Sequence, residues 1–253
     1  MMGITFGSFY TLAVYRIPKK QDIIHTHSYC PNCNHKLGIW DLIPVFSYIF
    51  LGGKCRYCGQ KIRPRYFILE TLSGIMFLIF AAVLKMNIYN WNITTIINFA
   101  ILVLYFTFVV LMAGIDKEKK EINKPVLVYG IIISMLYMIY LYIIEKTSID
   151  RYVIYWVIAV MMLFVEKIVK KSSNKYNCSI ITTLLIMTIF TGEYSIILTC
   201  ITTVFAILIY KVIMKIKAKD EKTKIPIGFY LAVTNIFCMI FMMLYMMCSV
   251  APL

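Results

Sequence analysis

Cys30-Pro31-Asn32-Cys33 and Cys55-Arg56-Tyr57-Cys58 are two Cys-x-x-Cys hooks, separated by the 21 residues 34–54. Two hooks at this spacing are typical of a tetrahedral zinc site, because each hook brings two sulfurs onto one ion. A basic surround also favours the thiolate form that binds metal. The alternative is a pair of disulfides. We therefore predict that Cys30, Cys33, Cys55 and Cys58 bind one structural zinc ion.

The composition indicates a membrane protein. Of the 253 residues, 61% are hydrophobic and the mean hydropathy is +0.79, whereas soluble domains have about 45–50% apolar residues. The formal net charge of +14 could suggest nucleic acid, but the basic residues alternate with long apolar runs. We interpret them as topology signals and expect no nucleic-acid partner. The predicted fold class is an all-α polytopic membrane protein.

Seven apolar runs approach the length of about 20 residues that a transmembrane helix needs. An eighth run, 1–15, would rise only about 22 Å as a helix, short of a hydrocarbon core of about 30 Å. We expect it to be either a tilted span or an incomplete one. The other expected spans are 66–84, 94–115, 125–144, 152–169, 176–192, 194–214 and 225–250. The prediction is therefore about eight transmembrane helices.

Lys and Arg accumulate in alternate loops, which predicts the orientation. The loops 16–65, 117–124, 167–175 and 211–224 hold 23 of the 26 basic residues. Since basic residues collect on the cytoplasmic side, we expect the cysteine loop in the cytosol. Cytosolic thiols are kept reduced, which favours zinc over disulfides.

The first loop is the only expected extramembrane region that is long enough to fold. Its residues 18–65 are too few to support a core alone, so the region needs a metal as a staple. Within it, residues 40–51 form an apolar stretch that is too short to span and suits the membrane surface or core packing. No internal repeat is apparent in the sequence.

Four carboxylates lie inside or at the ends of expected spans, where acidic residues are costly and are functional candidates by default. Glu193 stands in a hairpin turn, and Glu166 precedes Lys170 by four residues, the spacing of a helical ion pair. Glu70 lies one turn inside its span and is expected to meet an Arg or a backbone donor from another helix. Asp116 is the sharpest candidate, because it ends an uninterrupted apolar run on the face that carries the cysteine loop.

Several motifs resemble the type IV prepilin peptidase family. The resemblance is dense over the first 75 residues and extends to Ile115-Asp116 and to Ile225-Pro226-Ile227-Gly228. The motifs of the first part are 7–18 (GSFYTLAVYRIP), 28–33 (SYCPNC), 41–48 (DLIPVFSY), 55–59 (CRYCG) and 65–74 (RYFILETLSG). Their order and spacing are specific to that family.

The resemblance implies an eight-span aspartyl endopeptidase of the bacterial inner membrane that removes the basic leader of pilin precursors at the cytosolic face. Members often methylate the new N-terminus with S-adenosylmethionine, which is an expected cofactor here only where methyltransferase activity is retained. The chain would divide into a first transmembrane helix (1–17), a cytosolic four-cysteine zinc domain (18–65) and a seven-helix peptidase-like domain (66–253). The expected partners are prepilin-like substrates and membrane lipids.

The match to the family fails at the second catalytic position. There the family has Gly-x-Gly-Asp, whereas this chain has Asn174-Lys175-Tyr176-Asn177. The resemblance therefore implies Asp116 as the first catalytic residue and puts Asn177 at the second, with Glu166 as a candidate substitute. Losing one general acid or base typically costs about 10²–10⁴ in rate. Two hypotheses follow: a prepilin leader peptidase, or a proteolytically impaired homologue that binds prepilin or a partner in pilus or type II secretion assembly.

Overall fold

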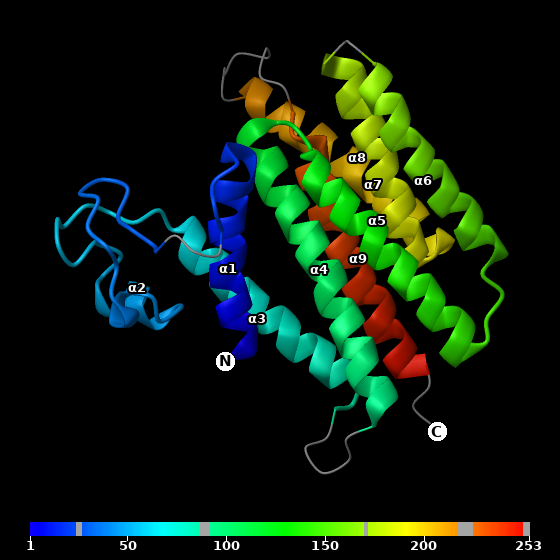
Figure 1. Ribbon diagram of the computed structural model, residues 1–253, viewed down its shortest axis with the longest axis horizontal. Coiled ribbons are helices and arrows are strands. Elements are labelled where there is room, and N and C mark those ends of the chain that lie inside the picture. Colours follow the sequence, from blue (N-terminus) through cyan, green and yellow to red (C-terminus); the bar gives the residue numbers. More distant parts are fainter. Residues whose placement is uncertain (24–26, 87–91, 170–171, 217–224, 250–253) are drawn as a thin grey trace. The chain divides into compact units, whose positions relative to one another are not determined.

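The computed structural model describes residues 1–23, 27–86, 92–169, 172–216 and 225–249. The described part is all-α, as expected, and its only β pairing consists of two isolated bridges, Tyr29–Lys36 and Lys54–Lys61 (Figure 1). The chain forms two compact units, Met1–Phe99 and Ala100–Leu253. Helix α4 begins in the first unit and continues into the second.

The long helices of the described part coincide with the expected spans. They are α1 (Met2–Arg16), α3 (Arg65–Val83), α4 (Ile93–Lys119), α5 (Lys124–Tyr140) with its π-helical continuation η3 (Leu141–Glu145), α6 (Asp150–Ile168), α7 (Ser172–Thr191), α8 (Glu193–Ile216) and α9 (Ile227–Ser249). Five segments are long and apolar enough to cross a membrane: Arg65–Val83, Ile93–Lys119, Lys124–Glu145, Glu193–Lys215 and Ile227–Tyr245. Helices α1, α6 and α7 do not reach that level, so within the described residues length and composition support five of the expected spans.

Proline and glycine mark helix ends where their backbone chemistry requires it. Pro125 lies in the first turn of α5, where a missing N–H leaves no hydrogen bond unmade. Gly192 has a φ of 80° and joins α7 to α8. Glu193 follows it and accepts hydrogen bonds from Arg151 (3.2 Å) and from the Tyr155 hydroxyl (3.0 Å). Glu193 thus has the structural role expected of a turn residue.

In the first unit, α1 and α3 pack through small residues (Figure 1). A Cβ on Gly7 would lie 2.6 Å from Cα of Glu70, and one on Gly3 would lie 2.8 Å from the carbonyl oxygen of Ser73. Gly74 makes the reciprocal contact with α1, because its Cβ would lie 2.8 Å from a methyl group of Ile4. The spacing Gly3-x-x-x-Gly7 therefore acts as a small-residue motif that lets α1 and α3 approach closely.

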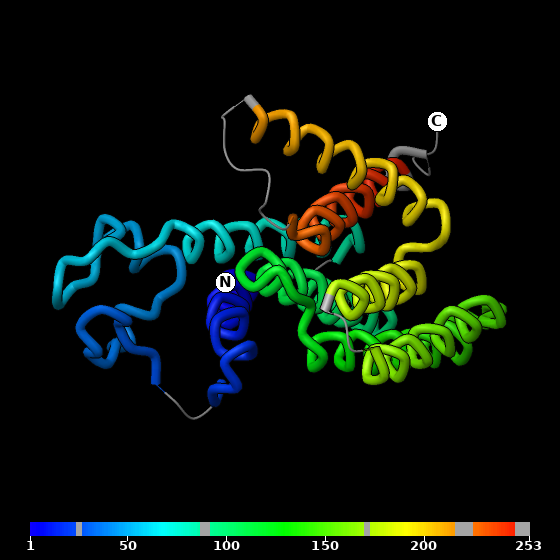
Figure 2. The backbone as a smooth tube through the Cα atoms, turned by 90° about the horizontal axis from the view of Figure 1, so that it is seen from above, coloured from blue at the N-terminus to red at the C-terminus, as the bar shows by residue number. Residues whose placement is uncertain are grey.

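The second unit contains the close helix pairs α6–α7 and α8–α9, which lie side by side in Figure 2. Its interior is partly polar. The hydroxyl of Tyr105 on α4 donates to Oδ1 of Asn235 on α9 at 2.6 Å, and Nδ2 of Asn235 donates to Thr199 on α8 at 3.4 Å. All three side chains are buried. Interhelical hydrogen bonds of this kind help to hold membrane helices together, because lipid tails are as apolar as the helix side chains and apolar burial gives no driving force for association.

Candidate functional sites: a four-cysteine cluster and a buried carboxylate

Each Cys-x-x-Cys hook folds as a tight backbone turn. In the first, the amide of Asn34 donates to the carbonyl of Cys30 at 2.9 Å, and Asn34 has a φ of 56°. In the second, Gly59 donates to the carbonyl of Cys55 at 2.9 Å and has a φ of 67°. Asn and Gly are the residues that accept this left-handed conformation at least cost. The turns direct the cysteine sulfurs of each hook toward one point.

The two hooks repeat one another at an offset of 25 residues. Cys30 donates its amide to His35 and Cys55 donates its amide to Gln60, at 3.0 and 2.9 Å. The bridge Tyr29–Lys36 is likewise matched by Lys54–Lys61. The expectation of no internal repeat is therefore wrong at this scale. It failed because the repeat lies in backbone hydrogen bonds and in very few identical side chains.

The four sulfurs fit a tetrahedral metal ion. All four Sγ atoms lie within 4.8 Å of one another, and those of Cys30 and Cys58 are 3.9 Å apart. Zinc–sulfur bonds of about 2.3 Å would separate the sulfurs of a tetrahedron by about 3.8 Å. Cys30 and Cys55 are buried, whereas Cys33 and Cys58 are exposed. The cluster can therefore hold a metal ion.

The pKa values of the two exposed cysteines are shifted in opposite directions. The backbone amide of Gln60 and the side-chain amide of Asn32 lower the pKa of Cys58 to about 7. At Cys33 the backbone amide of His35 lowers the pKa, but partial desolvation and the neighbouring Cys30 and Cys58 outweigh it and raise the pKa to about 11. One sulfur is thus close to the thiolate state before any ion binds, and a cation would relieve the repulsion among the others.

Asp41 joins the second hook to the segment between the hooks. Its carboxylate accepts hydrogen bonds from Arg56 Nε at 2.7 Å, the Tyr57 hydroxyl at 3.0 Å and the Gly38 amide at 3.1 Å. Burial raises the pKa of Asp41, but these donors outweigh it and hold the pKa below its usual value. The ring of Tyr57 also lies against His35, two residues after the first hook, with centroids 3.6 Å apart and the ring planes tilted by 32°. Both hooks are therefore fixed by contacts beyond the cysteines.

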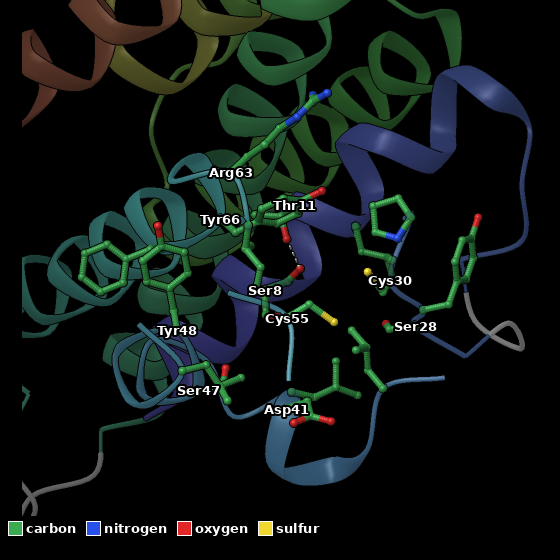
Figure 3. Close-up of a pocket in the computed structure, with 18 of the residues that line it drawn as sticks. Ser8, Thr11, Ser28, Cys30, Asp41, Ser47, Tyr48, Cys55, Arg63 and Tyr66 are labelled. Atoms are coloured by element: carbon green, nitrogen blue, oxygen red, sulfur yellow. Dashed lines mark hydrogen bonds between the residues drawn. The ribbon is translucent and has the colours of Figure 1, made fainter. Parts of the chain in front are cut away.

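The segment between α1 and α3 that carries both hooks is called here the cysteine region. A cavity of about 520 Å³ lies between this region and the helices of the first unit. Its walls include Ser8 and Thr11 of α1 on one side and Cys30, Cys55 and Asp41 on the other (Figure 3). The remaining lining is rich in Arg and Tyr side chains. Its volume falls in the range of about 300–1,000 Å³ that small-molecule sites occupy.

The second site surrounds Asp116, which is fully buried at the end of α4. Its Oδ1 accepts a hydrogen bond from the Tyr176 hydroxyl at 2.9 Å, and its Oδ2 accepts one from the backbone amide of Phe229 at 3.0 Å. The Tyr176 oxygen in turn accepts the amide of Ile227 at 2.9 Å. The carboxylate and the phenol together satisfy amide groups at the start of α9, where the helix dipole favours negative charge.

The predicted partner of Asp116 is not part of this group. Asn177 follows Tyr176 in α7, but its side chain is exposed, and within the described residues it makes no hydrogen bond. Sequence reasoning missed Tyr176. It also missed the meaning of Gly228, where a Cβ would lie 3.1 Å from Oδ2 of Asp116. The available signal was the glycine itself, which stands at the start of the expected span 225–250 and lets a neighbouring side chain approach the backbone closely.

The other two acidic candidates have partners of different kinds. Glu166 is buried and lies 3.7 Å from Nζ of Lys124, while its Oε2 has no hydrogen-bond partner among the described residues. The predicted partner Lys170 lies outside those residues. Glu70 accepts the backbone amide of Val45 at 2.7 Å, so the expected backbone donor is present but comes from the cysteine region, not from a helix.

Comparison with known proteins connects the first unit to a family. Residues 1–84 match the family model of the bacterial peptidase A24 N-terminal domain. The resemblance to the prepilin peptidase family is confirmed. The prepilin leader peptidase/N-methyltransferase of Vibrio cholerae is 35% identical over 114 residues, 42% of this chain and 42% of that protein. The enzymes of the same name from Myxococcus xanthus and Bacillus subtilis are 38% and 39% identical over 77 residues.

The chain matches less than half the length of each of these prepilin peptidases. The matched part covers 30% of this chain in both the Myxococcus and Bacillus comparisons, and 23% and 31% of those two proteins. No solved structure matches the chain. The similarity is thus concentrated in the unit that carries the four cysteines, and the Asp116 site lies in the other unit.

Proposed function

We propose that this chain is a proteolytically impaired prepilin peptidase homologue that binds prepilin-like proteins at the cytosolic face of the bacterial inner membrane. The observation that carries the proposal is the pair of hydrogen bonds at Asp116. One carboxylate oxygen accepts the phenol of Tyr176 and the other accepts the amide of Phe229. The group that meets Asp116 from α7 is therefore a phenol and not a carboxylate.

The chemistry of an aspartyl protease explains why this matters. Two carboxylates hold one water so that one acts as base while the other, kept protonated, polarises the carbonyl. A phenol with an ordinary pKa of about 10 donates a hydrogen bond but does not take a proton from water at neutral pH. The Tyr176 oxygen is also occupied by the amide of Ile227. In the resting geometry Asp116 serves as an acceptor for the start of α9.

The leader peptidase activity of the relatives is the competing hypothesis, and Glu166 would then supply the second carboxylate. The buried Oε2 of Glu166, which lacks a partner among the described residues, favours that hypothesis. Its other oxygen already lies near Lys124, which supports a structural ion pair instead.

Zinc is the proposed occupant of the cysteine cluster, as a structural ion. Four sulfurs within 4.8 Å of one another give the closed thiolate set of structural zinc sites, with no position left for water. The positive-inside pattern supports a cytosolic location, in which free thiols persist and bind metal. Zinc would contribute folding energy to a region that has little core of its own.

Methyl transfer is a second candidate function, favoured by the cavity of about 520 Å³ in the unit that matches the family. S-adenosylmethionine carries an adenine ring, a ribose and a carboxylate, and the cavity lining offers tyrosine rings, polar groups and basic side chains. Tyr29, Tyr48 and Arg63 are the residues we assign to hold it. When bound, S-adenosylmethionine would supply the methyl group.

The test of the main proposal is co-expression with a prepilin that an intact relative cleaves. The unmodified chain should co-purify with the precursor and leave its leader in place. The triple variant Asn174→Gly, Tyr176→Gly, Asn177→Asp restores the family motif and should restore cleavage, and adding Asp116→Ala should abolish it again. Asn177→Gln is the matched control and should remain inactive. Cleavage by the unmodified chain that disappears in Glu166→Gln would overturn the proposal and make Glu166 the second carboxylate.

A further inference from the structure

We propose that the segment between the two hooks inserts into the lipid interface and anchors the cysteine region to the membrane surface. The inserting surface, called here the apolar wedge, belongs to η2 (Ile39–Asp41), to α2 (Phe46–Phe50) and to Leu42 between them. Its members are Ile39, Trp40, Leu42, Phe46, Ile49 and Phe50, all of them exposed. The inference does not depend on the catalytic state of the chain.

The exposure of the wedge is unusual for a region outside the membrane. Ile39 and Phe50 are both 84% exposed and Trp40 is 76% exposed. Soluble surfaces rarely display large apolar side chains in one contiguous segment, and where they do, the patch marks a protein or membrane contact. The wedge therefore needs an occupant, and its depth relative to α3 identifies that occupant.

Two contacts fix the depth of the wedge along α3. The amide of Val45 donates to Glu70 at 2.7 Å, and the ring of Tyr48 stacks on Phe67 with centroids 5.2 Å apart. Helix α3 is a candidate span that begins at Arg65, and a helix rises about 1.5 Å per residue. The segment 45–48 thus lies about 3–8 Å inside the start of this span. Interfacial segments bury their apolar faces about 5–10 Å into the boundary between headgroups and acyl chains.

The backbone geometry at Val45 is consistent with a segment that is held in place. Val45 has a φ of 66°, which is rare for a β-branched residue, and the Phe46 amide donates to Pro44 across it at 2.7 Å. A strained turn persists only where its surroundings determine it. The buried carboxylate of Glu70 does so by accepting the Val45 amide, which would otherwise meet lipid without a partner.

Charge favours lipid as the occupant. From Ile39 to Gly53 the one ionisable carboxylate or amine belongs to Asp41, whose side chain is only 5% exposed and pairs with Arg56. No charge on the segment would have to enter the membrane. Helix α3, on which the segment packs through Val45 and Tyr48, also exposes large apolar side chains that suit lipid: Ile68, Leu72, Ile75 and Leu78. Trp at such a boundary matches the aromatic belt of membrane proteins.

The test uses the fluorescence of Trp40 in the full chain, reconstituted in phosphatidylcholine vesicles. The chain has three Trp residues, so Trp91→Phe and Trp156→Phe leave Trp40 as the single reporter. Lipids brominated near the headgroup end of the acyl chain should quench it at least about twofold more than lipids brominated near the methyl end, as a shallow interfacial position requires. Aqueous iodide should quench it weakly.

A matched control places the reporter on the second hook. Tyr57→Trp, combined with Trp40→Phe, Trp91→Phe and Trp156→Phe, puts the single Trp at an exposed position of the same region. Iodide should quench this Trp and brominated lipid should not. Quenching of Trp40 by iodide alone would overturn the proposal and indicate that the wedge faces water and awaits a protein. Quenching by neither agent would also overturn it, because the wedge would then be covered by protein such as a second copy. Metal content equal to that of the unmodified chain verifies that both variants are folded.

Discussion

Replacing Tyr176 by Phe should destabilise the second unit, because it removes one oxygen and nothing else. The Tyr176 hydroxyl donates a hydrogen bond to Oδ1 of Asp116 at 2.9 Å, and its oxygen accepts one from the Ile227 amide at 2.9 Å. A hydrogen bond to a charged group contributes about 1.5–3 kcal/mol, and a buried amide left without a partner costs about 1–3 kcal/mol. Since Ile227 is only half-buried, water will offset part of the second term. We expect a loss of about 3 kcal/mol.

The loss can be measured by thermal or denaturant unfolding in detergent. About 3 kcal/mol corresponds to more than a hundredfold change in the folding equilibrium and to a fall in Tm of about 6–12 °C for a unit of this size. Tyr194→Phe is the matched control, because Tyr194 is 86% exposed, and it should change stability by less than about 0.5 kcal/mol.

A double-mutant cycle isolates the Tyr176–Asp116 interaction from the rest. Asp116→Ala removes the same hydrogen bond, so the double variant should be less destabilised than the two single losses added together, by about 1–3 kcal/mol. Additive losses, or a Tyr176→Phe variant as stable as the Tyr194→Phe control, would refute the assignment of Asp116 and Tyr176 to one hydrogen-bonded group.

Three further outcomes are expected. Purified protein should contain about one zinc per chain, and Cys55→Ser should abolish binding and expose the cysteine region to proteolysis, because metal binding and folding are coupled in a region this small; metal-free but protease-resistant protein would contradict this. Gly7→Ala should cost about 1–3 kcal/mol, since its Cβ would lie 2.6 Å from Cα of Glu70; unchanged stability would refute the close packing of α1 on α3. On intact cells, a membrane-impermeant thiol reagent should label a cysteine introduced at Gly192 and should not label one introduced at Lys120; the reverse result would invert the proposed orientation.

The positions of the helices could be predicted from sequence because apolar runs determine them. The expected run 94–115 became α4 (Ile93–Lys119), and 194–214 became α8 (Glu193–Ile216). The cysteine cluster was equally accessible, since the Cys-x-x-Cys spacing is imposed by the backbone turn that delivers two sulfurs to one ion. Both features depend on local sequence, so a single chain without relatives is sufficient to read them.

The partner of Asp116 could not be predicted in the same way. Adjacent residues of an α-helix point about 100° apart, so alignment of a motif to within one residue does not identify the side chain that faces a neighbour. Asn177 and Tyr176 differ by one position, yet one is exposed and the other is bonded to Asp116. Residues on α4, α7 and α9 meet here at separations of 60 and 113 in sequence, and no local pattern encodes such a meeting.

Asp116 and Glu70 also show how an acidic residue in a membrane helix can be explained without catalysis. Each accepts a backbone amide that its surroundings leave without another acceptor: Phe229 at the start of α9, and Val45 in a tight turn. An unpaired amide in a membrane costs several kcal/mol, and a carboxylate next to several donors is a strong acceptor. A helix start or a turn at membrane depth thus supplies a structural reason for a carboxylate. An acidic residue near such a feature therefore becomes a catalytic candidate only after its backbone partners are accounted for.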